Sequence, residues 1–391
     1  MVPFSRSKRK FQVTSTRMIT ASDRMGRIFQ QHPRIWVAIT LWIASNVFVT
    51  GVARIATWEG NASYRGMASL CQWDCGWFST VMESGYDKTP TRDVIGSTNW
   101  PFHPLFPLTA YPFWHWLKLP PPMSLVLASK LALLLAVYGF LLMMSDQVDS
   151  TADLFRAGSL VAFNPYVIYA HAGYSEPLYF CLLALAFYLA RQRRWIASGT
   201  MGALASGTRV LGFVFPISYM IVWLEDQNWR IDWRRLDLNR IIGLLLCPLG
   251  TAIYMLYLYH HTGDALAQVH GHAAWGKSPG NPFHAIWFAL TMHHWPRVWG
   301  IMTILGLLAS AYLFKLRKAE LGVFLAICVL LTISGGYTAI ARNIWWQPPF
   351  LYAIYCALKR RTGAWLIYTA FVSGMASFMI LEWFTGHNFV N

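Results

Sequence analysis

Long apolar runs separated by short polar segments dominate the chain. The runs fall near residues 35–54, 123–144, 157–173, 174–190, 195–208, 209–224, 241–259, 293–314, 321–335, 346–358 and 364–384. A straight helix needs about 20 apolar residues to cross a bilayer, so the shorter runs are expected to be tilted or broken helices. The pattern predicts an all-α, polytopic membrane helix bundle with about 11 transmembrane spans, and about 10 to 13 spans are compatible with it.

The connecting segments predict how the chain is oriented. Most of the 32 Lys and Arg lie in basic clusters between the apolar runs: the N-terminal segment, 191–194, 230–240, 315–318 and 359–361. Basic loops resist translocation, so these clusters are expected on the cytoplasmic side. Residues 101–117, PFHPLFPLTAYPFWHWL, would reverse this order if they spanned, and we therefore expect them to be re-entrant or interfacial.

The orientation gives a domain plan. Residues 1–34 form a basic cytoplasmic N-terminal segment, and residues 35–385 form a single transmembrane domain. Residues 55–122 are the first outer loop, with interfacial helices, and residues 386–391 are a short outer tail. Only Cys71 and Cys75 could pair, because the other four Cys lie inside apolar runs.

Composition supports the membrane interpretation. The chain is 55% hydrophobic and 13% charged, and it contains 20 Trp, 18 Tyr and 24 Phe. Aromatic rings of this kind concentrate at the two bilayer interfaces. The net charge of +15 follows from the basic loops, so we expect no nucleic-acid partner.

Unusual charged groups gather at the predicted outer ends of the runs. Asp74 lies in CQWDCGWFSTVMESGYD, Glu176 in AGYSEP, Arg209 in SGTRVLG and Arg342 in YTAIARNIWWQPP. Ionisable groups at membrane depth are costly unless they pair or line a cavity, which makes them candidates for function. Simpler roles remain open: Asp74 as a solvated loop acid, Glu176 as a helix cap, and Arg342 as a side chain that reaches lipid headgroups.

A second group of candidates surrounds these charges in the outer loops. His270 and His272, downstream of Asp264, could contact a phosphate, whereas their spacing matches no strong metal motif. We therefore predict no metal site, although a divalent metal stays possible. The candidate substrate-binding residues are Trp73, Trp77, His103, Tyr174, Gln268 and Trp275.

An outward-facing carboxylate beside an arginine suits transfer from a lipid-linked sugar phosphate. Such a transfer needs a base for the acceptor hydroxyl and a cation for the departing phosphate. Asp74 and Glu176 are the candidate catalytic acids, and the donor phosphate would be held by Arg209, Arg342, His270 and His272. The alternatives are a membrane transporter or lipid flippase and a non-catalytic subunit of a membrane complex.

Several segments resemble one known family. WDCGWFSTVMESGY, PFHPLFPL, FNPYVIYAHAGYSEPLYF and ALASGTRVLGFVFP occur in the order found in PIG-V-like mannosyltransferases, within the GT-C superfamily. The loop TGDALAQVHGHAAWG is also similar, and the resemblance covers residues 70–360. It departs from the family at His103 and in ARNIWWQPPF.

The resemblance implies a GT-C fold and an inverting transfer of a hexose, usually mannose, from a polyprenyl-phosphate donor. Asp74, Glu176 and Arg209 are the residues that match the family's functional positions. The acceptor would be a glycan, a glycolipid or a protein, and the active site would face the non-cytoplasmic side. A bacterial plasma membrane is favoured, with the endoplasmic reticulum as the alternative.

Overall fold

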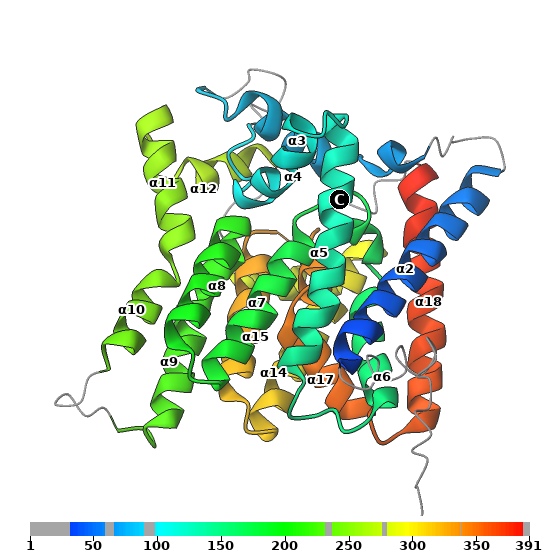
Figure 1. Ribbon diagram of the computed structural model, residues 1–391, viewed down its shortest axis with the longest axis vertical. Coiled ribbons are helices and arrows are strands. Elements are labelled where there is room, and N and C mark those ends of the chain that lie inside the picture. Colours follow the sequence, from blue (N-terminus) through cyan, green and yellow to red (C-terminus); the bar gives the residue numbers. More distant parts are fainter. Residues whose placement is uncertain are drawn as a thin grey trace, which may run out of the picture.

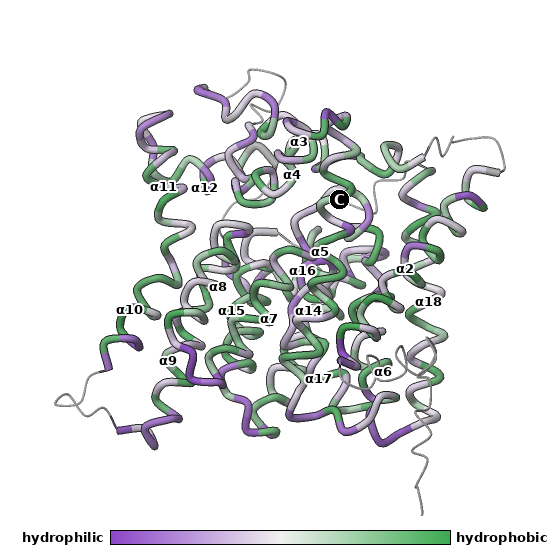
Figure 2. Tube along the Cα trace, viewed as in Figure 1, coloured by the Kyte–Doolittle hydropathy of each residue, from purple (hydrophilic) through white to green (hydrophobic). Residues whose placement is uncertain are grey.

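A computed structural model describes residues 32–58, 66–89, 98–230, 237–275, 280–336 and 338–385. All regular elements within these ranges are helices, as the sequence predicts. Figure 1 shows them as a bundle, and Figure 2 shows hydrophobic positions along its middle with hydrophilic positions toward its two ends. The predicted basic segment before residue 32 and the tail 386–391 lie outside the described residues.

Among the described residues, four helices are long and apolar enough to cross a membrane. They are α2 (Pro33–Trp58), α5 (Pro121–Met143), α14 (Trp295–Lys315) and α18 (Thr362–Thr385). A fifth candidate is the pair α10 (Leu238–Leu246) and α11 (Leu249–Thr262), bent by 45° at the break that contains Pro248. The full number of spans remains a prediction.

Shorter helices fill the spaces between these long ones. They are α6 (Thr151–Ala162), α7 (Glu176–Arg191), α8 (Trp195–Thr208), α9 (Phe215–Asp226), α13 (Pro282–Thr291), α15 (Ala319–Ser334), α16 (Ile340–Trp345) and α17 (Pro348–Leu358). Most of their bounds follow the predicted runs. The exceptions are α6, which begins and ends earlier than the run 157–173, and α13 and α16, where no run was predicted.

One end of the bundle, here called the site end, carries short helices instead of long ones (Figure 1). These are α3 (Asp74–Ser84), α4 (Leu105–His115) and α12 (Ala267–Gly271), with the 3₁₀ turns η1 (Met67–Leu70) and η5 (His272–Trp275) nearby in sequence. With 11 residues, α4 is about 16 Å long and cannot cross a bilayer alone. This length agrees with an interfacial role for residues 101–117.

The predicted run 157–173 is one of the shorter runs that were expected to be tilted or broken, and it is not one continuous helix. Helix α6 ends at Ala162, where Asn164 and Pro165 follow, and only the short 3₁₀ turn η2 (Val167–Ala170) forms before α7. Proline stops the helical hydrogen bonding, and irregular backbone at membrane depth is tolerated only where protein buries it. We call residues 163–175 the broken segment; its residues 167–175 are all buried.

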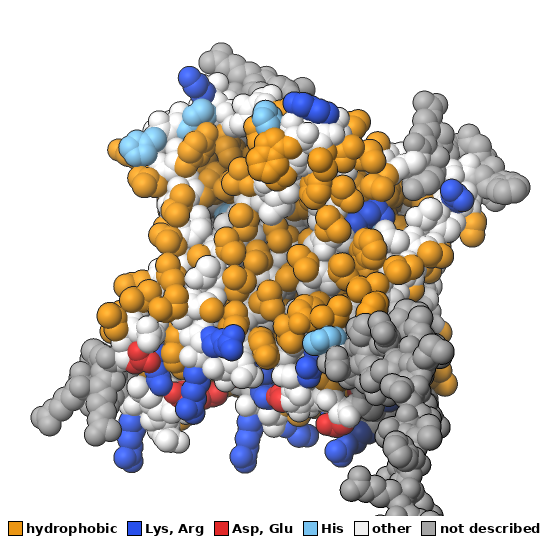
Figure 3. Space-filling view, viewed as in Figure 1, with side chains coloured by type: hydrophobic (Ala, Val, Ile, Leu, Met, Phe, Trp, Pro, Cys, Tyr) orange, Lys and Arg blue, Asp and Glu red, His pale blue; other side chains and the backbone are white. Residues whose placement is uncertain are grey.

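The opposite end of the bundle is basic. Figure 3 shows Lys and Arg gathered there beneath a hydrophobic middle belt. Arg191 at the end of α7 pairs with Glu320 of α15, and Lys318 lies 2.6 Å from Asp146. The basic clusters after α7 and before α15 therefore meet at a common end, as the sequence predicts.

Glycines allow α8 to approach α10 and α11 closely. A Cβ atom built on Gly199 would lie 2.0 Å from the Gly243 carbonyl oxygen, and one on Gly250 would lie 2.0 Å from that of Ala203. These obstacles are backbone atoms, which cannot rotate away as a side chain can. Small residues permit such close packing between membrane helices.

We predict that Gly250→Ala lowers the free energy of unfolding by about 1–3 kcal/mol, because overpacking must displace backbone. Gly51→Ala is the matched control, since a Cβ atom at Gly51 in α2 meets nothing within 4 Å. Thermal unfolding in detergent measures both variants. A melting temperature of Gly250→Ala equal to that of the control would contradict the close approach.

Candidate functional site

Four charged side chains from four separate segments converge at the site end. Asp74 is the first residue of α3, Glu176 the first of α7, Arg209 follows the last residue of α8, and Arg342 lies in α16. Arg209 Nη1 lies 2.7 Å from Glu176 Oε1, and Arg342 Nε lies 3.4 Å from the same oxygen. Arg342 Nη1 also donates to Asp74 Oδ2 at 3.3 Å. The sequence prediction that these residues share one face is therefore matched by direct contacts.

The four side chains differ in their access to solvent. The exposed fraction of the side chain is 1% for Glu176, 11% for Arg342, 20% for Arg209 and 27% for Asp74. Glu176 is thus the buried centre of the cluster, whereas Asp74 is the carboxylate that a substrate can reach. Glu176 Oε2 accepts no hydrogen bond within the described part of the chain.

Glu176 does more than cap its helix. The N-cap residue Ser175 makes no side-chain capping hydrogen bond. The carboxylate of Glu176 instead lies between two guanidinium groups, although its place in the first turn also complements the helix dipole. A buried carboxylate requires such partners, because an unpaired charge in the interior is strongly destabilising.

Arg342 faces the interior and does not reach for lipid headgroups. Its guanidinium carbon lies 4.8 Å from the centre of the Tyr169 ring and 5.8 Å from that of Tyr174. These cation–π contacts add to its two carboxylate contacts. The headgroup interpretation of Arg342 is therefore wrong, and its role belongs with the cluster.

Arg209 has two polar partners that sequence reasoning missed. Its Nη1 donates to Ser175 Oγ at 3.2 Å, and its Nη2 donates to Asn343 Oδ1 at 2.8 Å. Ser175 lies next to Glu176, and Asn343 lies next to Arg342. Their positions beside candidate residues were the only available signal. The neutral partners orient the guanidinium without adding negative charge.

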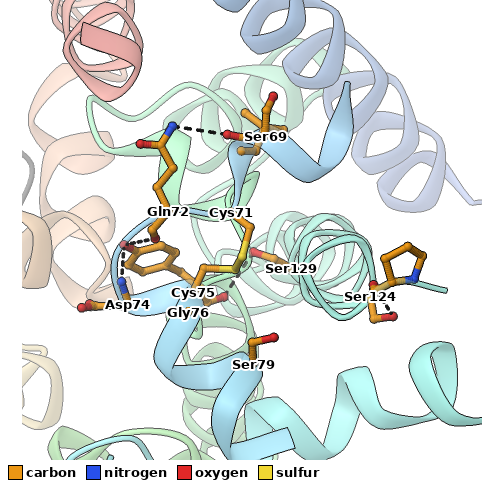
Figure 4. The surroundings of a disulfide bond; sticks show 12 residues. Ser69, Cys71, Gln72, Asp74, Cys75, Gly76, Ser79, Ser124 and Ser129 are labelled. Atoms are coloured by element: carbon orange, nitrogen blue, oxygen red, sulfur yellow. Dashed lines mark hydrogen bonds between the residues drawn. A yellow bond between two sulfur atoms is a disulfide. The ribbon is translucent and has the colours of Figure 1, made fainter. Parts of the chain in front are cut away.

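The backbone around Asp74 is held by a covalent and a hydrogen-bonded clamp. Cys71 and Cys75 form a disulfide across it, as predicted from the sequence (Figure 4). The Tyr174 hydroxyl accepts from the Asp74 N–H and donates to the Gln72 carbonyl, both at 3.1 Å. Tyr174 therefore acts as a support of Asp74 as well as a neighbour of Arg342.

The two tryptophans near Asp74 pack in different ways. Trp73 has a positive φ of 49° and its ring meets Trp383 of α18 edge to face at 4.5 Å. Trp77 stacks on Phe102 at 5.9 Å. Trp73 thus anchors the start of α3, and Trp77 contributes an aromatic surface beside it.

His103 and Gln268 form a second polar group close to the site. His103 is 4% exposed, and its Nδ1 donates to the Ser206 carbonyl at 2.9 Å, since a carbonyl can only accept. Burial is the largest cause of a His103 pKa lowered to about 4, and the charges of His272 and Arg209 act in the same direction. The hydrogen bonds that His103 makes with the Ser206 carbonyl and the Gln268 side chain oppose the shift. Gln268 is also 4% exposed.

The remaining predicted residues lie farther out or outside the described region. His270 contacts Asp264 at 2.6 Å, and its side chain is 63% exposed. The hydrogen bond from His270 lowers the pKa of Asp264. His272, which influences His103, lies in η5; the side chain of Trp275 is not among those described. No group of three or more His, Cys, Asp or Glu suited to a metal occurs in the described part of the chain.

Several solved structures are similar to this chain, and two of them are described here. ArnT from Cupriavidus metallidurans bound to undecaprenyl phosphate matches with a TM-score of 0.51 and 14% identity, covering 90% of this chain and 64% of ArnT. The archaeal oligosaccharyltransferase AglB from Archaeoglobus fulgidus, in complex with an inhibitory peptide and a dolichol-phosphate, matches with a TM-score of 0.44 and 12% identity, covering 90% of this chain and 56% of AglB. This chain thus spans less than two thirds of either relative.

No family model matches the sequence, and no curated protein matches it. The likeness to ArnT is one of fold, and it confirms the predicted all-helical membrane architecture. Together with the long apolar helices, it identifies the chain as an integral membrane protein. The narrower assignment to PIG-V-like mannosyltransferases stays a prediction.

We predict that His103 makes the fold sensitive to acid. Its pKa of about 4 in the folded chain lies below the ordinary value of 6.5, so the unfolded chain binds the extra proton first. Stability should fall by up to about 3 kcal/mol as the pH drops from 6.5 toward 4. Melting temperatures in detergent across this range should fall less for His103→Gln than for the wild type. Parallel curves would show that His103 does not carry the effect.

Proposed function

We propose that this protein is an inverting glycosyltransferase that transfers a hexose from a polyprenyl-phosphate sugar to an acceptor hydroxyl. The observation that carries the proposal is the cluster of Asp74, Glu176, Arg209 and Arg342 at one end of a GT-C-like bundle. The cluster supplies a reachable carboxylate and two arginines at membrane depth. These are the groups that transfer from a lipid phosphate requires.

Asp74 is the proposed general base. Its carboxylate takes the proton of the acceptor hydroxyl while that oxygen forms a bond to the anomeric carbon of the sugar. The bond from the anomeric carbon to the phosphate oxygen breaks with its electron pair, and the lipid phosphate leaves. One displacement of this kind inverts the anomeric centre. The partial exposure of Asp74 supports this role, whereas Glu176 is too deeply buried for it.

Arg209 and Arg342 are the proposed phosphate ligands. Both guanidinium groups are held by Glu176 and by neutral partners, so they are oriented before a phosphate arrives. Pre-oriented charge stabilises a departing anion most effectively in a dry site. His272 and His270, the other predicted phosphate contacts, lie nearer the outer loops and are proposed to contribute less.

We keep mannose as the proposed hexose on the family resemblance, and a glycan, glycolipid or protein as the acceptor.

Separate observations support the lipid-linked donor and the side of the membrane that the active site faces. ArnT was solved with undecaprenyl phosphate and AglB with a dolichol-phosphate, which supports a polyprenyl-phosphate donor for this fold. The Cys71–Cys75 disulfide beside Asp74 fits an oxidising compartment, and the opposite end of the bundle is basic. Both features favour an active site on the non-cytoplasmic side, with a bacterial plasma membrane as the proposed location.

We predict that Asp74→Asn lowers kcat by about 10²–10⁴-fold, because the amide cannot accept the hydroxyl proton. Glu83→Gln on the same helix is the matched control, since Glu83 is exposed and contacts only Ser79 among described polar partners. The assay follows labelled hexose from a polyprenyl-phosphate donor into covalent product in liposomes. Full transfer by Asp74→Asn would remove the assignment, and label that crosses the bilayer without bond formation would favour a transporter.

We predict that Arg209→Ala raises the donor KM and lowers kcat/KM by about 10²-fold, through loss of a charge-assisted contact to phosphate. Arg297→Ala, which removes an exposed arginine near the start of α14, serves as the control. Donor concentration is varied at saturating acceptor. An unchanged donor KM and kcat in Arg209→Ala would contradict its phosphate role.

A further inference from the structure

A second buried polar cluster lies among α2, α5 and the broken segment. Lys130 of α5 is 6% exposed, and its Nζ lies 2.6 Å from Asn46 Oδ1 and 3.0 Å from His171 Nδ1. His171 is fully buried, and its Nε2 lies 3.0 Å from Ser45 Oγ of α2. Ser45 Oγ in turn lies 2.7 Å from the Ala162 carbonyl oxygen. The proposed transfer reaction uses none of these groups.

The chemistry of the groups fixes the direction of every hydrogen bond. The Ala162 carbonyl can only accept, so the Ser45 hydroxyl donates to it and accepts from His171 Nε2–H. His171 Nδ1 then carries the lone pair, which accepts from the amine of Lys130. The result is one directed chain that runs from α5 through the broken segment to α2 and the end of α6.

Burying such a polar cluster in a membrane core costs free energy. Among the described residues, Lys130 contacts an amide oxygen and an imidazole nitrogen rather than a carboxylate, so no ion pair in that part of the chain offsets its desolvation. A leucine in α5 and a phenylalanine in the broken segment would pack there at lower cost. Ionisable groups buried at membrane depth generally serve a function.

The cluster is connected to the site through the broken segment. Ser129, next to Lys130, donates to the carbonyl of Tyr169 at 3.2 Å and to that of Tyr174 at 3.1 Å. The rings of these two tyrosines hold the guanidinium of Arg342, and the Tyr174 hydroxyl holds the backbone at Asp74. His171 lies between the two tyrosines in the sequence. Contacts that hold His171 in place therefore also hold Tyr169 and Tyr174, which contact Arg342 and the backbone of Asp74.

We propose that Lys130 and His171 are positioning residues for the active site. Through the hydrogen-bond chain they hold the broken segment against α2 and α5, and that segment holds Tyr169, Tyr174 and Glu176 in their observed places. They touch neither substrate nor reacting atoms. This role rests on the proposed glycosyl transfer for its effect on rate, whereas the hold on the broken segment is a separate physical claim.

The test compares Lys130→Met, Lys130→Arg and Leu131→Met in detergent-purified and lipid-reconstituted full-length protein. Lys130→Met removes the donor at similar length, Lys130→Arg retains a cationic donor, and Leu131→Met is a conservative change at the next, partly exposed position of α5. Hydrogen–deuterium exchange of the peptide covering residues 163–176 reports the hold on the broken segment. Transfer kinetics, corrected for the folded fraction, report the consequence for catalysis.

We expect Lys130→Met to raise exchange in this peptide and to lower kcat by about 10- to 10²-fold, since small misplacements of catalytic groups have effects of this size. Lys130→Arg should restore most of both, and Leu131→Met should match the wild type. If Lys130→Met fails to fold, Asn46→Leu takes its place because it removes one acceptor of the Lys130 amine. The same increase in exchange and the same decrease in kcat are then expected for Asn46→Leu.

Two outcomes would overturn the proposal. One is unchanged exchange of residues 163–176 in Lys130→Met. The other applies if the wild type transfers hexose: Lys130→Met would show increased exchange but the same kcat per folded molecule as the wild type. The cluster would then stabilise the fold without positioning the active site. A wild type that transfers no hexose would contradict the proposed function instead, and the exchange data would still decide the hold on the broken segment.

Discussion

The arrangement of the site depends on one buried carboxylate. Glu176, whose side chain is 1% exposed, lies between the guanidinium groups of Arg209 and Arg342 and so connects α7, the end of α8 and α16. An unpaired charge there would be strongly destabilising, so the three segments are obliged to meet. With Asp74 included, two carboxylates face two arginines and the formal charges balance. In the proposed reaction an arriving phosphate would disturb that balance and compete first with Asp74 for Arg342, because the Asp74 side chain is 27% exposed whereas that of Glu176 is 1% exposed.

The sequence predicted most of the helices because their apolar runs are continuous and local. Runs such as 123–144 and 364–384 correspond to α5 and α18 almost residue for residue. The run 157–173 could be expected to be tilted or broken because it is short, but hydrophobicity alone does not distinguish a helix from buried irregular backbone. Pro165 was the signal that could have placed the break. The bundle's helix contacts were beyond prediction, since the glycines that allow α8 to approach α10 are ordinary residues until their neighbours are known.

The site was predictable in its members and not in its geometry. Asp74, Glu176 and Arg209 stood out as charges in apolar surroundings, and the structure pairs Arg209 with Glu176. Arg342 and Asp74 are 268 positions apart, so their contact could not be inferred from spacing. Neutral partners such as Asn343 and Ser175 carry no sequence signal of their own. Lys130 was hidden for a related reason: one lysine within a long apolar run looks tolerable until its buried partners appear.

The broken segment explains how the two polar clusters can coexist. A regular helix turns by about 100° per residue and would present Tyr169, His171 and Tyr174 on diverging faces. After Ala162 the backbone leaves the helix, and the Asn164 side chain accepts from the Tyr166 N–H at 2.8 Å within the segment that follows. His171 can then face α2 and α5 while the tyrosine rings face Arg342. Irregular backbone at membrane depth is costly unless protein satisfies its polar groups, and Ser129 and Asn164 do so here. The break between α6 and α7 thus places the residues that support the site.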